Sequence, residues 1–362
     1  MTDETRIVKT FLQLVQIDSP TGHEGQIAGV LTDMLREMGL HVRGDAAGNV
    51  IATLDGEGEP ILLSAHMDTV EPGRGIKPIV KDGIITSDGT TILGGDCKAG
   101  IAVILEALQC LRDSGARHVP LEIVLSVAEE GGLNGAKKLD VAALRSKVGL
   151  VLDSGGPIGT LVRQAPSQDS LRVVIHGKAS HAGAEPEKGI NAIVVAAEAV
   201  AQMPLGRIDE ETTANIGKIS GGIATNIVPD RVEMAGEARS LKNEKLAAQT
   251  DRMVKAVETA AAKRGAKADI EVHHAYDAYF LPDDDPWIQR LAAACARAGL
   301  KPVLHSSGGG SDANIYNGKG LRCAVTSVGM AKGHTTEECI AIADMVAAAR
   351  LVYTVVTEVT ER

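Results

Sequence analysis

Five residues in separate segments of the sequence have side chains that could bind a metal ion. Their donors are imidazoles and carboxylates, with no pair of thiols: His66, Asp96, Glu130, Asp153 and His334. This mixture suits zinc, cobalt or manganese in a catalytic site, whereas structural zinc sites rely on cysteine. Each residue lies at or just beyond the end of a predicted strand, where open α/β sheets bind their ligands. We therefore predict that the five converge on two divalent metal ions, a frequent arrangement in hydrolases.

Two acidic residues beside these candidate ligands could support hydrolysis. Asp68 lies two residues after His66 on an extended segment, so both side chains share a face and Asp68 could orient the imidazole. Glu129 precedes Glu130, so their side chains diverge and Glu129 could act as a general base on water. The alternative interpretations are a buried histidine followed by a turn-capping aspartate, and a solvent-exposed acidic turn.

Two further segments carry residue types that could bind a substrate. His181 lies among small residues in Ser180-His181-Ala182-Gly183, and the sequence SGGGSD spans 307–312. Successive glycines let backbone N–H groups approach an anion. The alternatives are a surface histidine and a flexible loop. The sequence lacks GxGxxG, GxxxxGK[ST] and GxSxG motifs, and carboxylates beside Cys97 would raise its thiol pKa and disfavour it as a nucleophile.

The elements that must position these residues fall into two groups. Segments with strand and helix periodicity alternate in the first half, which predicts an α/β fold with a mixed sheet flanked by helices. The predicted strands are 49–54, 61–65, 121–128 and 148–152, and the predicted helices are 7–16, 24–38 and 101–111. The same character returns after residue 282, with a helix at 287–298, a strand at 323–327 and a helix at 338–359. Thr335 and Glu338 are spaced as a capping box for that last helix.

The intervening region has a different composition of elements. It contains predicted strands at 171–178, 212–219, 231–239 and 268–274, with helices at 190–202 and 245–263. Strands grouped with two helices predict an α+β domain inserted into the first. We expect a catalytic domain at 1–166 and 279–362, and a lid and dimerisation domain at 167–278.

Composition excludes several classes of partner. The chain has 362 residues, a net charge of −10 and only 2% aromatic residues, so a nucleic-acid-binding surface is not expected. No apolar run approaches the ~20 residues of a membrane span, and the N-terminus lacks the apolar stretch of a signal peptide. Five scattered cysteines are typical of free thiols in a reducing compartment. A cytoplasmic protein is expected.

Taken together, the motifs resemble the co-catalytic zinc exopeptidases, which include peptidase T, carboxypeptidase G, aminoacylase and succinyl-diaminopimelate desuccinylase. They occur in the same order as in that family and extend over nearly the whole chain. The stretches GGDCKAG and AEEGGLNGAK are most similar to the peptidase T-like branch. Cys97 departs from the Asp or Asn common there. The matching stretches are SAHMDTV (64–70), GGDCKAG (94–100), AEEGGLNGAK (128–137), LDSGG (152–156), ASHAGAEPEKGINA (179–192), TNIVPD (225–230), EARS (237–240), GGGSDAN (308–314) and GHTTEE (333–338).

The resemblance implies a role for each candidate ligand. His66 and Asp153 would bind one metal ion, Glu130 and His334 would bind the other, and Asp96 would bridge both. Asp68 would orient His66 and Glu129 would be the general base. The peptide bond that joins Asp96 to Cys97 would be cis.

The resemblance also implies a homodimer and a substrate class. His181 would reach the partner subunit's site and donate a hydrogen bond to the developing oxyanion, while Asn226, Arg239, Gly309 and Gly310 would hold the substrate. The expected activity is that of an aminopeptidase acting on short peptides, similar to a tripeptidase. An N-acyl amino acid deacylase or a dipeptidase on the same scaffold is the alternative. A further alternative is a non-catalytic binding protein. The presence of Glu129 speaks against it, because a binding protein needs no general base.

Overall fold

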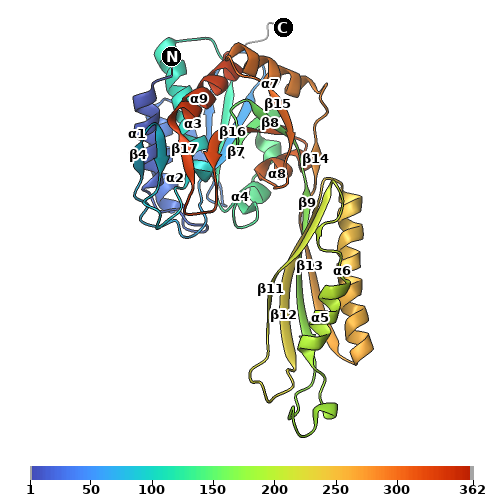
Figure 1. Ribbon diagram of the computed structural model, residues 1–362. Coiled ribbons are helices and arrows are strands. Elements are labelled where there is room, and N and C mark those ends of the chain that lie inside the picture. The colour runs from blue at the N-terminus through green and yellow to red at the C-terminus, as the bar shows by residue number, and fades with distance from the viewer. Residues whose placement is uncertain (1, 359–362) are drawn as a thin grey trace. The chain divides into compact units, whose positions relative to one another are not determined.

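The computed structural model describes residues 2–358, which form two compact units (Figure 1). Of the described residues, unit 1 comprises 2–164, 280–307 and 311–358, and unit 2 comprises Ala165–Tyr279 with Gly308–Gly310. The catalytic role expected for one region and the lid and dimerisation role expected for the other remain predictions. Within 2–358, no helix is both long and apolar enough to cross a membrane.

Unit 1 is built on a 12-stranded mixed sheet. Neighbouring strands run in the order β1 (His41–Gly44), β2 (Val50–Leu54), β6 (Leu121–Ser126), β3 (Ile61–His66), β7 (Val148–Gly155), β16 (Arg322–Ala331), β17 (Cys339–Ala341), β5 (Ile84–Thr86) and β4 (Ile79–Lys81). The same sheet includes β8 (Thr160–Ala165), which pairs with β16, β14 (Tyr279–Phe280) and β15 (Val303–Ser306).

The centre of this sheet is parallel and fully covered. Strands β6, β3, β7 and β16 are parallel neighbours, and every residue of β3 and β6 is buried. Strands covered on both faces read as nearly continuous apolar runs, as ILLSAH and LEIVLS do. The carboxyl ends of these parallel strands therefore lie at one edge, where β3 ends at His66.

Helices cover the sheet of unit 1. α3 (Gly95–Ser114) and α9 (Ile342–Val356) pack on its centre, with α1 (Glu4–Val15) and α7 (Pro286–Arg297) against them. α2 (Gly25–Glu37) packs on β1 and β2, while α8 (Asp312–Gly318) packs on β16 and α4 (Asn134–Lys138), which a short 3₁₀ turn at Val141–Ala143 follows. The predicted α/β core with a mixed sheet flanked by helices is confirmed.

Two predicted details of unit 1 are wrong. Asp96 does not follow a strand, because α3 begins at Gly95 and Asp96 has non-helical dihedral angles within its first turn. The helix at 338–359 does not begin at Glu338, because β17 intervenes and α9 begins at Ile342 after an N-cap, Ala341, that makes no side-chain hydrogen bond. The predicted end of that helix, Val359, lies outside the described residues.

Unit 2 is a two-layer α+β structure. Its five-stranded antiparallel sheet has the order β10 (Gly206–Arg207), β11 (Thr212–Gly221), β12 (Arg231–Ser240), β9 (Ser167–His176) and β13 (Lys267–Tyr276). α5 (Ala192–Gln202) and α6 (Asn243–Arg264) pack on the sheet, and apolar side chains from both helices and the strands form one core. A 3₁₀ turn at Pro186–Lys188 precedes α5.

Candidate metal centre

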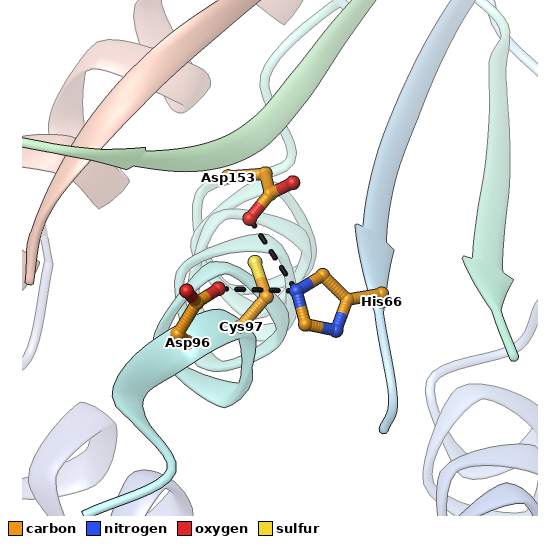
Figure 2. A group of neighbouring side chains, drawn as sticks. All are labelled: His66, Asp96, Cys97 and Asp153. Atoms are coloured by element: carbon orange, nitrogen blue, oxygen red, sulfur yellow. Dashed lines mark hydrogen bonds and ion pairs between the residues drawn. The ribbon is translucent and has the colours of Figure 1, made fainter. Parts of the chain in front are cut away.

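The buried His66 and the partly buried carboxylates of Asp96 and Asp153 form one part of the candidate metal centre (Figure 2). The imidazole Nε2 lies 3.1 Å from Asp96 Oδ1 and 3.4 Å from Asp153 Oδ1. The three residues come from the end of β3, the start of α3 and the interior of β7. Cys97 Sγ lies within the same group but donates a hydrogen bond to the Leu152 carbonyl at 2.7 Å. The peptide bond from Asp96 to Cys97 is cis, as the resemblance implied.

Asp96 connects this group to a second one. While its Oδ1 faces His66, its Oδ2 lies 3.3 Å from Nε2 of His334. His334 also lies 2.7 Å from Glu130 Oε1. One carboxylate therefore separates two imidazoles, and each imidazole has a second acidic neighbour of its own. The structure thus brings together all five candidate ligands, and their roles as ligands remain a prediction.

Asp68 contacts His66, and the Glu129 carboxylate lies within 4.8 Å of donor atoms of His66 and Glu130. His66 Nδ1 lies 2.9 Å from the Asp68 carbonyl oxygen and 3.5 Å from its carboxylate. That carboxylate accepts hydrogen bonds from the backbone N–H groups of Glu129 and Glu130 and from the Thr21 hydroxyl. Asp68 therefore holds the segment that carries both glutamates as well as contacting the imidazole.

Burial and proximity shift the proton affinities of this cluster. Burial raises the pKa of Glu129 well above its ordinary value and that of Asp153 to about 7. Hydrogen bonds with Asp96 and Glu130 raise the pKa of His334 to about 10. Burial lowers the pKa of His66, but the nearby aspartates, led by Asp153, outweigh it and the net pKa is raised. Crowded, buried carboxylates of this kind favour a bound cation, and the imidazole and carboxylate donors fit divalent zinc.

Sequence reasoning missed two buried acids beside the cluster. Glu338, taken for a helix cap, accepts hydrogen bonds from the backbone N–H groups of Leu93, Gly94 and Asp96. Asp312 accepts a 2.5 Å hydrogen bond from Ser126 through Oδ2, and its Oδ1 has no hydrogen-bond partner among the described residues. Glu338 lies in the stretch GHTTEE and Asp312 lies in GGGSDAN. Both stretches match the family, and that match was the one sequence signal that could have identified these two acids.

The predicted substrate-binding residues divide between two ends of the sheet in unit 2. Arg239 lies opposite Gln168 at the start of β9 and donates hydrogen bonds to Glu237. Gly310 approaches Tyr276 so closely that a Cβ would fall 2.3 Å from its ring, and the Tyr276 hydroxyl donates to Gln168. These residues, with Gly309 beside Gly310, form one end.

His181 and Asn226 lie together beyond the other end of β9. A backbone bridge joins His181 to Ile227, and the Asn226 carbonyl accepts the Ala182 N–H at 2.9 Å. The ten residues of β9, at ~3.3 Å each, span ~30 Å. The structure therefore keeps His181 and Asn226 of one chain far from Arg239 of the same chain.

Comparison with known proteins gives close relatives along the whole chain. The sequence profile of peptidase family M20/M25/M40 matches residues 62–358. The chain is 44% identical to the uncharacterized protein YqjE of Bacillus subtilis, covering 99% of each. It is also 44% identical to the crystal structure of aminopeptidase PepT from Bacillus cereus, with a TM-score of 0.92 and coverage of 99% of this chain and 100% of that one. A tripeptidase structure from Staphylococcus aureus is 40% identical, with a TM-score of 0.96 and coverage of 99% of each chain.

Proposed function

The chain belongs to peptidase family M20/M25/M40, and we propose that it is a two-metal aminopeptidase that cleaves N-terminal residues from short peptides. Hydrolysis of peptide bonds follows from the family. The aminopeptidase activity is supported by the similarity to the aminopeptidase of B. cereus and the tripeptidase of S. aureus over nearly the whole chain.

The position of Asp96 is the observation that carries the two-metal proposal. Its two carboxylate oxygens face two different histidines, His66 and His334, which is the arrangement a bridging carboxylate needs. Asp153 would complete one metal site and Glu130 the other. Zinc is the proposed metal, and cobalt or manganese would also suit these donors. Bound there, the ions would polarise the scissile carbonyl and lower the pKa of the attacking water.

Glu129 is the proposed general base. It would take a proton from the attacking water and pass it to the leaving amine. A base with this double role must hold a proton at neutral pH for part of the cycle. The Glu129 carboxylate lies within 4.8 Å of the donor atoms of His66 and Glu130, which supports that role. Asp68 would support the reaction by fixing the backbone of Glu129 and the ring of His66.

We further propose a homodimer in which His181 completes the active site of the partner subunit. Its Nδ1 accepts the backbone N–H groups of Gly183 and Ala184, so the ring proton resides on Nε2. The exposed ring can therefore donate to a developing oxyanion, which is commonly worth ~2.7–4 kcal/mol. The distance along β9 between His181 and Arg239 supports action in the partner, if Arg239 and the Gly309–Gly310 segment hold the same substrate molecule.

We also propose a cytoplasmic location. The support is that Cys97, Cys110, Cys295, Cys323 and Cys339 are all unpaired. Free thiols persist in a reducing compartment.

The substrate proposal is tested with matched peptides. A tripeptide with a free amine and the same tripeptide with an acetylated amine are incubated with metal-loaded protein, alongside N-acetyl amino acids and dipeptides. An aminopeptidase releases the first residue of the free tripeptide only. Rapid hydrolysis of the acetylated amino acids, with the free tripeptide left intact, would instead indicate a deacylase.

A further inference from the structure

Glu338 forms a three-point anchor for the segment that leads into Asp96. Its Oε2 accepts the N–H groups of Leu93 and Gly94, each at 2.8 Å, and its Oε1 accepts the N–H of Asp96 at 2.9 Å. The side chain is almost fully buried, with a relative exposure of 1%. A charge buried this deeply is retained only where hydrogen bonds compensate for lost water.

The anchored segment has little support from regular structure. Asp96 and Cys97 have non-helical dihedral angles, and Gly94 has a φ of +74°. The first N–H groups of a helix have no intrahelical acceptor, so they need one from elsewhere. Glu338 supplies that acceptor, and it does so next to the carboxylate proposed to bridge the two metal ions.

Glu338 also belongs to the segment that carries His334. Its own N–H donates to the Thr335 carbonyl, one residue beyond that histidine. His334 adopts a left-handed conformation with φ of +63°, and its ring faces Asp96. The segment 334–338 therefore carries the proposed ligand His334 at one end. At its other end, the Glu338 carboxylate holds the backbone of the proposed ligand Asp96.

We propose that Glu338 is a positioning residue that sets the place of Asp96 relative to His334 and thereby determines metal affinity. The inference rests on the proposed two-metal function. Hydrogen-bond partners behind a ligand typically account for 10–100-fold in metal affinity. Gly95 supports the assignment, because a Cβ there would lie 3.0 Å from Glu338 Oε1 and crowd the anchor.

The test is Glu338→Gln, which keeps the shape but replaces one acceptor oxygen with an NH₂ group. At least one of the three N–H groups then faces a donor. We expect metal affinity, measured by competition with a chelator of known affinity, to fall 10–100-fold. Excess zinc should restore most of kcat/KM, because the proposed ligands and the base remain.

Glu122→Gln is the matched control. The Glu122 carboxylate is also buried and accepts three hydrogen bonds, from the Arg145 N–H and from the N–H and hydroxyl of Ser146. Those donors carry no proposed ligand. Thermal unfolding of both metal-free variants shows how far each is destabilised. We expect Glu122→Gln to keep native metal affinity whatever its stability.

Gly95→Ala provides a second variant that leaves Glu338 in place and crowds its carboxylate. We expect a smaller loss of metal affinity from this variant. Native affinity in Glu338→Gln would overturn the proposal, as would an equal loss in Glu122→Gln, since affinity would then follow general stability. If the unmodified protein bound no metal, the two-metal function itself would fail.

Discussion

Glu129 and Glu130 are neighbours in sequence, but their side chains have different environments. Glu130 lies 2.7 Å from His334, whereas Glu129 is buried and its backbone N–H donates to Asp68. The two carboxylates do not diverge as predicted, because one oxygen of each and a ring nitrogen of His66 all lie within 4.8 Å of one another. A base placed beside a ligand in this way is what metal-assisted hydrolysis requires. Both glutamates come just after β6, where Ala128 has a φ of +50°.

Glu129→Gln should therefore keep metal and lose the reaction. The amide cannot accept a proton from water, and general bases commonly contribute 10²–10⁴-fold to the rate. Metal content by elemental analysis and kcat on a tripeptide are measured together. Glu57→Gln, an exposed glutamate paired with Arg117, is the control and should have native kcat. Near-native turnover by metal-replete Glu129→Gln would contradict its role as the base.

At the scale of elements, the site depends on how closely α3 approaches β7. A Cβ on Gly100 would lie 2.1 Å from the Leu152 carbonyl oxygen, so only glycine permits this approach. The contact lies four residues after Asp96 in α3 and one residue before Asp153 in β7. It therefore fixes the separation between two of the proposed ligands.

Gly100→Ala should destabilise the fold. Overpacking of this kind typically costs ~1–3 kcal/mol, measured as the free energy of unfolding in denaturant. Gly29→Ala in α2 is the matched control, because its Cβ would meet no atom within 4 Å. A glycine in a helix interior costs up to ~1 kcal/mol relative to alanine, so this control should be slightly more stable. Unchanged stability of Gly100→Ala would show that α3 can shift freely.

The long elements were predictable from sequence, because apolar periodicity reports burial. The strand at 61–65 and the helix at 24–38 appear in the structure as β3 and α2, within one residue at each end. Short strands such as β17 and β4 have only three residues each and carry no periodic signal. These short strands are defined by their hydrogen bonds to neighbouring strands of the sheet, and not by a local pattern of apolar residues.

The candidate site was predictable in its residue types but not in all of its positions. Convergence of ligands at strand ends holds for His66, whereas Asp96 reaches the cluster from the start of a helix. The spacing of Thr335 and Glu338 matched a capping box, yet the Glu338 carboxylate bonds to a segment more than 240 residues earlier. No local rule reveals a tertiary contact of that range.

In the molecule as a whole, unit 2 carries candidate substrate-binding residues at two ends of one sheet. His181 and Arg239 are separated by the length of β9. If both act on one substrate molecule, they come from different subunits. The proposed homodimer therefore predicts that each active site needs residues from both subunits, in addition to predicting the mass in solution.

A mixture of His181→Ala and Glu129→Gln subunits tests that prediction. Each parent should be nearly inactive, while a mixed dimer has one site that combines an intact Glu129 with the partner's intact His181. Random exchange of equal amounts makes half of the dimers mixed, which restores roughly a quarter of native activity. Subunit exchange is verified with two distinguishable tags. No recovery after verified exchange would show that His181 does not act in the partner.

Metal content and hydrolysis, measured on the same sample, test the two-metal peptidase most directly. Dialysis against a chelator should remove two divalent ions per chain and abolish cleavage of a free tripeptide. Stepwise addition of zinc or cobalt should restore cleavage, with full activity reached at two equivalents per chain. Full hydrolysis after verified removal of the metal would contradict the account.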